Sequence, residues 1–74
     1  MAEKSWIAQR FDYDGNPLYE PVSVVGSTVG EATGSAIRVM DYRDWRSGVL
    51  VVISEGDDFE VRQQAALANL LAMR

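Results

Sequence analysis

The chain of 74 residues is 47% apolar and 24% charged, as is typical of soluble globular proteins, and its length suits one domain. Disordered, collagen-like and membrane-spanning classes are excluded, the last because the longest apolar run, residues 48–53, is far shorter than the ~18 residues that span a bilayer. The formal net charge of −4 argues against direct nucleic-acid binding, and the absence of cysteine and histidine removes disulfides, thiolate and imidazole metal sites, and most nucleophilic enzyme mechanisms.

The first two elements expected along the chain are strands joined by a turn. Apolar and polar side chains alternate over residues 6–13, which predicts a strand. Residues 14–17 read Asp-Gly-Asn-Pro and are typical of a turn. The β-forming residues over 18–25 predict a second strand, which Pro21 places at an edge or a bulge because proline lacks the N–H that a sheet interior needs.

The same turn resembles the start of a calcium-binding loop. Asp12, Asp14 and Asn16 have the spacing of the first three oxygen ligands of an EF-hand. Pro17 and Ser23, however, occupy the positions where that loop needs glycine and glutamate. A structural turn is therefore expected, and no metal.

The middle of the chain is harder to assign. Three glycines spaced by four, at positions 26, 30 and 34, predict a loop, and the chain lacks the Gly-Lys-Ser/Thr ending that a phosphate-binding loop requires, so no cofactor is expected. Alternation over residues 35–42 predicts a half-exposed strand, with a helix over about residues 30–40 as the alternative. The continuous β-branched run at 49–53 predicts a buried strand.

A helix is expected over residues 58–73, which contain strong helix formers and neither glycine nor proline. Asp57 and Glu60 have the spacing of a helix-capping pair. At 100° per residue, one apolar stripe should pack on the sheet, formed by Phe59, Ala66, Leu70 and Met73 with Leu67 and Leu71 beside it. A second, small-residue stripe should lie on another side of the helix, formed by Val61, Ala65, Ala68 and Ala72.

These elements predict a single α+β domain over residues 1–74, with a small antiparallel sheet of three or four strands packed against one C-terminal helix. The helix is apolar over more of its circumference than one sheet can cover. Since so small a chain without disulfides or metal has a limited core, the small-residue stripe is expected to contact a partner or a second copy of the chain.

Two clusters are candidate partner-binding sites. The first consists of four carboxylates within six residues, Glu55, Asp57, Asp58 and Glu60. Capping explains only Asp57 and Glu60, so a negatively charged contact surface is expected as well, and catalysis is not, because so small a domain offers little cleft. The second cluster consists of Arg43, Asp44, Trp45 and Arg46. It places a tryptophan between two arginines, residue types that are enriched at binding hot spots, although this tryptophan could instead cap the core.

In size, acidity and layout, the chain resembles the small phage and mobile-element proteins that block host defence, particularly anti-CRISPR proteins. The residues behind this resemblance are Asp44, the four clustered carboxylates and the turn at residues 14–16. The resemblance implies a non-enzymatic, phage-encoded inhibitor that binds a host protein or nucleoprotein complex, where its carboxylates would imitate phosphate charge toward a basic nucleic-acid-binding surface. The alternative is a homo-oligomeric structural or assembly module that uses the C-terminal helix.

The start of the chain suggests where such a protein would act. Residues 1–5 are not followed by the apolar segment of a secretory signal peptide. A cytoplasmic location is therefore expected, which would be the host cytoplasm for a phage-encoded protein.

Overall fold

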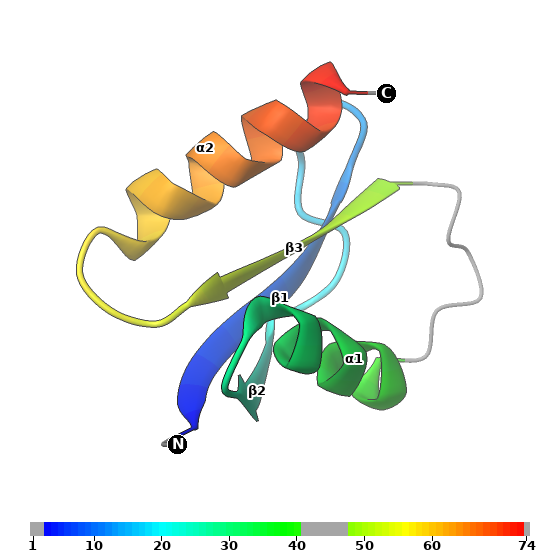
Figure 1. Cartoon of the computed structure of the whole chain (residues 1–74). Helices are drawn as coiled ribbons and strands as arrows, with labels where there is room; N and C mark the ends of the chain where they lie inside the picture. The colour runs from blue at the N-terminus through cyan, green and yellow to red at the C-terminus, as the bar shows by residue number, and fades with distance from the viewer. Residues whose placement is uncertain (1–2, 41–47, 74) are drawn as a thin grey trace.

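The structure is a computed structural model and describes residues 3–40 and 48–73 (Figure 1). In chain order its elements are β1 (Lys4–Asp12), β2 (Val22–Gly26), α1 (Val29–Val39), β3 (Gly48–Ser54) and α2 (Phe59–Ala72). The strands form an antiparallel sheet in the order β2-β1-β3. The α+β prediction is therefore confirmed, but the described residues form two helices packed on the sheet where one was expected.

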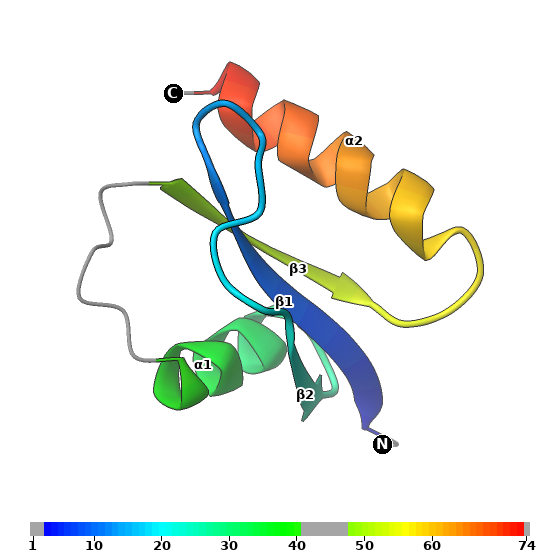
Figure 2. The ribbon, with the colours of Figure 1, turned by 180° about the vertical axis from the view of Figure 1, so that it is seen from behind.

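The two helices lie on opposite faces of the sheet, as Figures 1 and 2 show from front and back. On one face, α1 covers a core formed by Ala8, Val24, Ala32, Ala36 and Met40. On the other face, α2 covers a second core formed by Phe11, Val51 and Leu67. The sheet thus separates two small cores, and its central strand, β1, contributes to both.

The strand predicted over residues 35–42 is wrong: α1 extends to Val39, and positions 41 and 42 lie outside the described residues. The alternative, a helix over about residues 30–40, is confirmed, and the loop predicted at the three glycines is wrong from Val29 on, because Gly30 and Gly34 lie inside α1. The residue before the helix, Thr28, is its N-cap, and the Thr28 hydroxyl accepts a hydrogen bond from the Glu31 amide at 3.2 Å. The Glu31 carboxylate in turn accepts one from the Ser27 amide, also at 3.2 Å. This reciprocal cap offsets the cost of Gly30 and Gly34.

The other predicted elements are confirmed with shifted ends. β1 begins two residues before the predicted position 6, and β3 is one residue longer at each end than 49–53. β2 starts at Val22 and not at position 18, so Pro21 precedes the strand and does not interrupt it. β2 nevertheless lies at a sheet edge, as its proline indicated. α2 is one residue shorter at each end than predicted.

α2 packs on the sheet largely as its pattern indicated. Leu67 is buried in the core, and Ala66, Leu70 and Leu71 pack against it. The prediction that Met73 belongs to this stripe is wrong. Met73 follows the last helical residue and is 81% exposed. In the described part of the chain, neither helix has the length and hydropathy needed to cross a membrane.

Candidate partner-binding surface

The four clustered carboxylates form an acidic loop (Glu55, Asp57, Asp58 and Glu60) between β3 and the first turn of α2, and all four residues are exposed. Their side chains make no hydrogen bond or ion pair with any other described residue. The described residues also contain no group of three acidic side chains placed to hold a metal ion. The loop therefore presents negative charge outward, and its side chains remain available to a partner.

Arg62 holds the backbone of the acidic loop in place. Its guanidinium donates to the Ser54 hydroxyl and the Ser54 carbonyl, both at 2.8 Å, and to the Asp57 carbonyl at 3.2 Å. At the end of β3, the Glu55 amide donates to the Ser5 carbonyl at 2.9 Å. Because these bonds engage backbone groups on both sides of the loop, they favour one backbone conformation for the residues that carry the carboxylates.

The predicted capping role of Asp57 and Glu60 is wrong. The N-terminal cap of α2 is Asp58, which adopts a left-handed conformation at φ 60° and makes no side-chain capping bond. Its carbonyl instead accepts the first helical hydrogen bond, from the Arg62 amide at 2.9 Å. Capping therefore occupies none of the four carboxylates, although Glu60 lies in the first turn, where the helix dipole favours negative charge.

The second predicted cluster, Arg43, Asp44, Trp45 and Arg46, lies outside the described residues. The small-residue stripe (Val61, Ala65, Ala68 and Ala72) is exposed along its whole length, and Val61 is 69% exposed. At 100° per residue this stripe points directly away from Gln63 and Leu67, the buried residues of α2. The expected excess of apolar surface on this helix is therefore present.

The turn that resembled a calcium loop is built by one carboxylate. Asp12 Oδ1 accepts hydrogen bonds from the backbone amides of Asp14 and Asn16, both at 2.9 Å. The bond from Asn16 is the main cause that lowers the pKa of Asp12 below its usual 3.8. The carboxylate thus stabilises the turn itself, in agreement with the structural interpretation.

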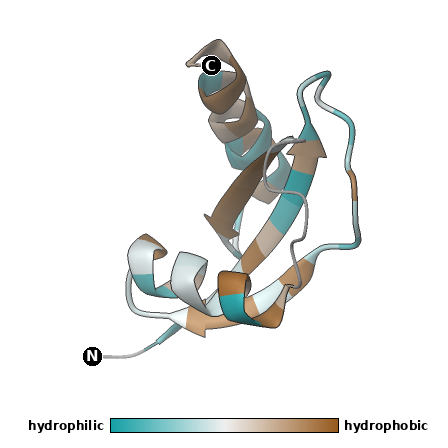
Figure 3. Cartoon of the chain, turned by 90° about the vertical axis from the view of Figure 1, so that its right-hand side faces the viewer, coloured by the Kyte–Doolittle hydropathy of each residue, from teal (hydrophilic) through white to brown (hydrophobic). Residues whose placement is uncertain are grey.

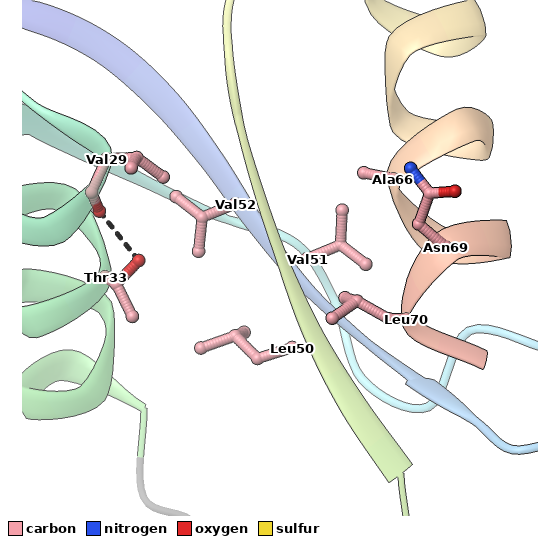
Figure 4. Close-up of a pocket in the computed structure, with 8 residues that line it drawn as sticks. All are labelled: Val29, Thr33, Leu50, Val51, Val52, Ala66, Asn69 and Leu70. Atoms are coloured by element: carbon pink, nitrogen blue, oxygen red, sulfur yellow. Dashed lines mark hydrogen bonds between the residues drawn. The ribbon is translucent and has the colours of Figure 1, made fainter. Parts of the chain in front are cut away.

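The structure also contains a groove that the sequence did not reveal. This edge groove, of about 310 Å³, lies along β3 between the two helices and is lined by Val29, Thr33, Leu50, Val51, Val52, Ala66, Asn69 and Leu70 (Figure 4). In Figure 4, Leu50 and Val52 point toward α1, whereas Val51 points toward α2. Since none of the described lining residues is an acid, a base or a cation, this part of the groove suits apolar contacts and offers no group for general acid–base catalysis.

Arg10 is the second feature that the sequence did not reveal. The alternation along β1 suggested a solvent-exposed polar residue, yet its side chain is only 1% exposed. It occupies a β1 position two residues after Ala8 and opposite Leu50 of β3, which places it on the α1 side of the sheet. Local alternation cannot predict that an arginine is buried in a sheet, because its burial depends on elements such as α1 that are distant in sequence.

The chain matches no protein-family model, no curated protein and no solved structure. Its functional interpretation therefore depends on the acidic loop, the small-residue stripe and the edge groove.

Proposed function

We propose that the protein is a non-enzymatic interaction protein of inhibitor type, which binds a basic surface of a partner protein or nucleoprotein complex through the acidic loop. The observation that supports this proposal is the presence of four exposed carboxylates that bond no other described residue, on a backbone to which Arg62 donates hydrogen bonds. An ordered backbone reduces the entropy lost on binding, and clustered charge of one sign accelerates encounter with a surface of the opposite sign.

The proposed partner class follows from the charge and from the resemblance to anti-CRISPR proteins. Nucleic-acid-binding proteins carry basic grooves that recognise phosphate, and closely spaced carboxylates present a comparable charge. We therefore propose a phage-encoded inhibitor that acts in the host cytoplasm and occupies such a groove without itself binding nucleic acid.

Reversing charge in the acidic loop tests this function. The double variant Glu55→Lys/Asp57→Lys should fold normally, because neither carboxylate bonds a described residue and neither position has a left-handed backbone, and should bind the partner at least tenfold more weakly. Partners would be captured from the source cell and identified by mass spectrometry, and affinity would then be measured with the purified partner at two salt concentrations.

A matched control distinguishes an effect of charge in the acidic loop from an effect of the total charge of the protein. Asp14→Lys/Glu20→Lys changes the net charge by the same amount at exposed positions outside the acidic loop. Equal loss of affinity in both double variants, or no loss in the first, would contradict binding through the loop.

The alternative, a homo-oligomeric assembly module, is supported by the exposed small-residue stripe on α2. Small side chains allow two helices to approach closely, and Val61 supplies apolar area. Sedimentation at high concentration distinguishes the two functions, since an oligomer should dissociate on Ala68→Glu, whereas a strict monomer would exclude the alternative.

A further inference from the structure

Among the described residues, the outer side of β3 is an unpaired sheet edge. β3 pairs with β1 on one side, and no described strand pairs with it on the other. The Glu55 amide donates to the carbonyl of Ser5, so these two residues form a hydrogen-bonded pair. Hydrogen-bonded pairs alternate along an antiparallel ladder, so the backbone groups of Val49, Val51 and Ile53 also point toward β1. The N–H and C=O groups of the alternate residues, Leu50 and Val52, therefore point outward.

No described residue hydrogen-bonds the outward groups of Leu50 and Val52. At the end of the strand the situation differs, because the Ser54 carbonyl accepts a bond from Arg62 at 2.8 Å. The free edge is thus a short stretch with two donors and two acceptors, which ends where the acidic loop begins.

The residues of β3 itself include none of those that normally prevent pairing at a sheet edge. β3 contains no charged residue and no proline over its seven positions. Figure 3 shows the same strand in brown along its length, whereas β1 carries hydrophilic bands. The opposite edge of the sheet differs, because β2 has only five residues and follows Pro21.

The walls of the edge groove fit one additional strand. A strand added to β3 would lie ~4.8 Å away and direct its side chains alternately to the two faces of the sheet. On one face these side chains would meet Val29 and Thr33 of α1, and on the other Ala66 and Leu70 of α2. Figure 4 shows α1 and α2 on either side of β3, so that an added strand would have lining residues of a helix on each face.

We propose that the edge groove binds an extended peptide segment of the partner by strand addition to β3, with alternating apolar residues and a basic residue at the end nearest the acidic loop. The basic residue is inferred from charge complementarity, since the groove leads along β3 to Ser54 and the four carboxylates. This part of the inference rests on the proposed function, whereas the strand addition itself does not.

A second copy of the chain fits the edge less well. Symmetric pairing of two β3 strands would bring both α2 helices over adjacent strands on the same face of the joined sheet. Packed helices need ~8–10 Å between their axes, whereas neighbouring strands are only ~4.8 Å apart. Since α2 already lines the groove beside β3, a single peptide is favoured over a dimer.

Selection from a displayed library of random twelve-residue peptides provides the probe. Enriched peptides should alternate apolar residues, end in lysine or arginine, and slow amide hydrogen exchange at Leu50 and Val52 at least tenfold. An absence of enriched peptides, or protection confined to the small-residue stripe, would overturn the inference. Pairing of β3 with a second copy would appear as the same protection without peptide.

The best enriched peptide would then be N-methylated at alternate residues in two versions. The version with methyl groups on the amides facing β3 should bind at least tenfold more weakly, while the version methylated on the opposite amides should keep its affinity. Equal effects would exclude strand addition. Thr33→Lys, which places a long side chain in the groove, should weaken binding of the unmethylated peptide.

The charge-reversed loop variant separates this inference from the proposed function. If partner binding is lost in the loop variant but peptides show no dependence on amide register, the proposed function stands and strand addition is wrong. If amide register matters and loop reversal leaves both partner and peptide affinity unchanged, strand addition stands, while the proposed function and the basic end of the peptide are wrong.

Discussion

Single glycines show where the backbone leaves no room for a side chain. A Cβ atom at Gly48 would overlap the carbonyl oxygen of Phe11 across the β1–β3 pair, and one at Gly26 would lie 2.8 Å from the Ala32 amide nitrogen. At Gly34, inside α1, nothing lies within 4 Å. The three evenly spaced glycines that predicted a loop therefore have unrelated structural roles. The sequence shows that each lacks a side chain, but it does not show which atoms surround each position.

Alanine substitution should separate these roles. Gly34→Ala should stabilise the protein by about 0.5–1 kcal/mol, because alanine has the higher helix propensity. Gly48→Ala should destabilise it, because the strand pair must shift to admit the methyl group. Urea denaturation would measure both changes, and equal stabilisation by the two substitutions would contradict the close approach of Gly48 to Phe11.

The Asp12 carboxylate should make stability depend on pH. Its folded-state pKa lies below 3.8, chiefly because of the bond from Asn16, so its contribution is present above that value and is lost as pH falls through the lowered pKa. The advantage of the wild-type protein over Asp12→Asn in urea denaturation should therefore shrink between about pH 5 and pH 2. Asp14→Asn is the control, because it removes a charge from the same turn but no accepted hydrogen bond. A constant advantage across this range would contradict the assignment.

Among the elements, α1 is a helix whose sequence alternates like that of a strand. Its buried residues are Ala32 and Ala36, with Met40 following at the same spacing of four, whereas the large residues Ile37 and Val39 are 44% and 64% exposed. The alternation that predicts a strand comes from these large exposed side chains. The helical spacing of four occurs mainly among small buried residues. The Thr28 and Glu31 capping pair was a stronger signal, since it identifies the helix start independently of hydropathy.

The other elements were predictable because each has a strong local signal. β3 consists of a β-branched run, and α2 of helix formers without glycine or proline. Of the candidate site, the exposure of the four carboxylates could be predicted, but not their lack of a capping role. That depends on the left-handed backbone of Asp58 and on Arg62, whose partners in β3 lie eight residues away.

Arg62 of α2 donates hydrogen bonds to Ser54 of β3, and its replacement should weaken the attachment of α2 to the end of β3. Arg62→Lys keeps the charge but cannot reproduce a planar fork that reaches both oxygens of Ser54 and the Asp57 carbonyl. We expect a loss of about 1–3 kcal/mol in unfolding free energy, and faster amide exchange at residues 55–58. Arg38→Lys, at an exposed position of α1, is the matched control. Exchange rates that stay unchanged would show that the acidic loop is ordered without this contact.

At the scale of the molecule, the arrangement of layers decides what the surface offers. Sequence predicted a sheet and more apolar helix surface than the sheet could cover, and both are present. It could not predict the edge groove, because that depends on α1 and α2 lying on opposite faces and extending beside the same edge strand. Crossovers between layers are set by long-range packing, which local periodicity does not encode.

The two cores should unfold together, since the central strand contributes Ala8 to one and Phe11 to the other. Leu67→Ala removes a buried side chain only from the core beneath α2 and should cost about 2–5 kcal/mol. Such a loss is large for so small a domain, so amide exchange in α1 should accelerate by the same factor as exchange in α2. Ala68→Gly is the control for helix propensity, because Ala68 is exposed on the same helix. If α1 keeps its protection while α2 loses its own, the faces are energetically independent, and β1 does not couple them.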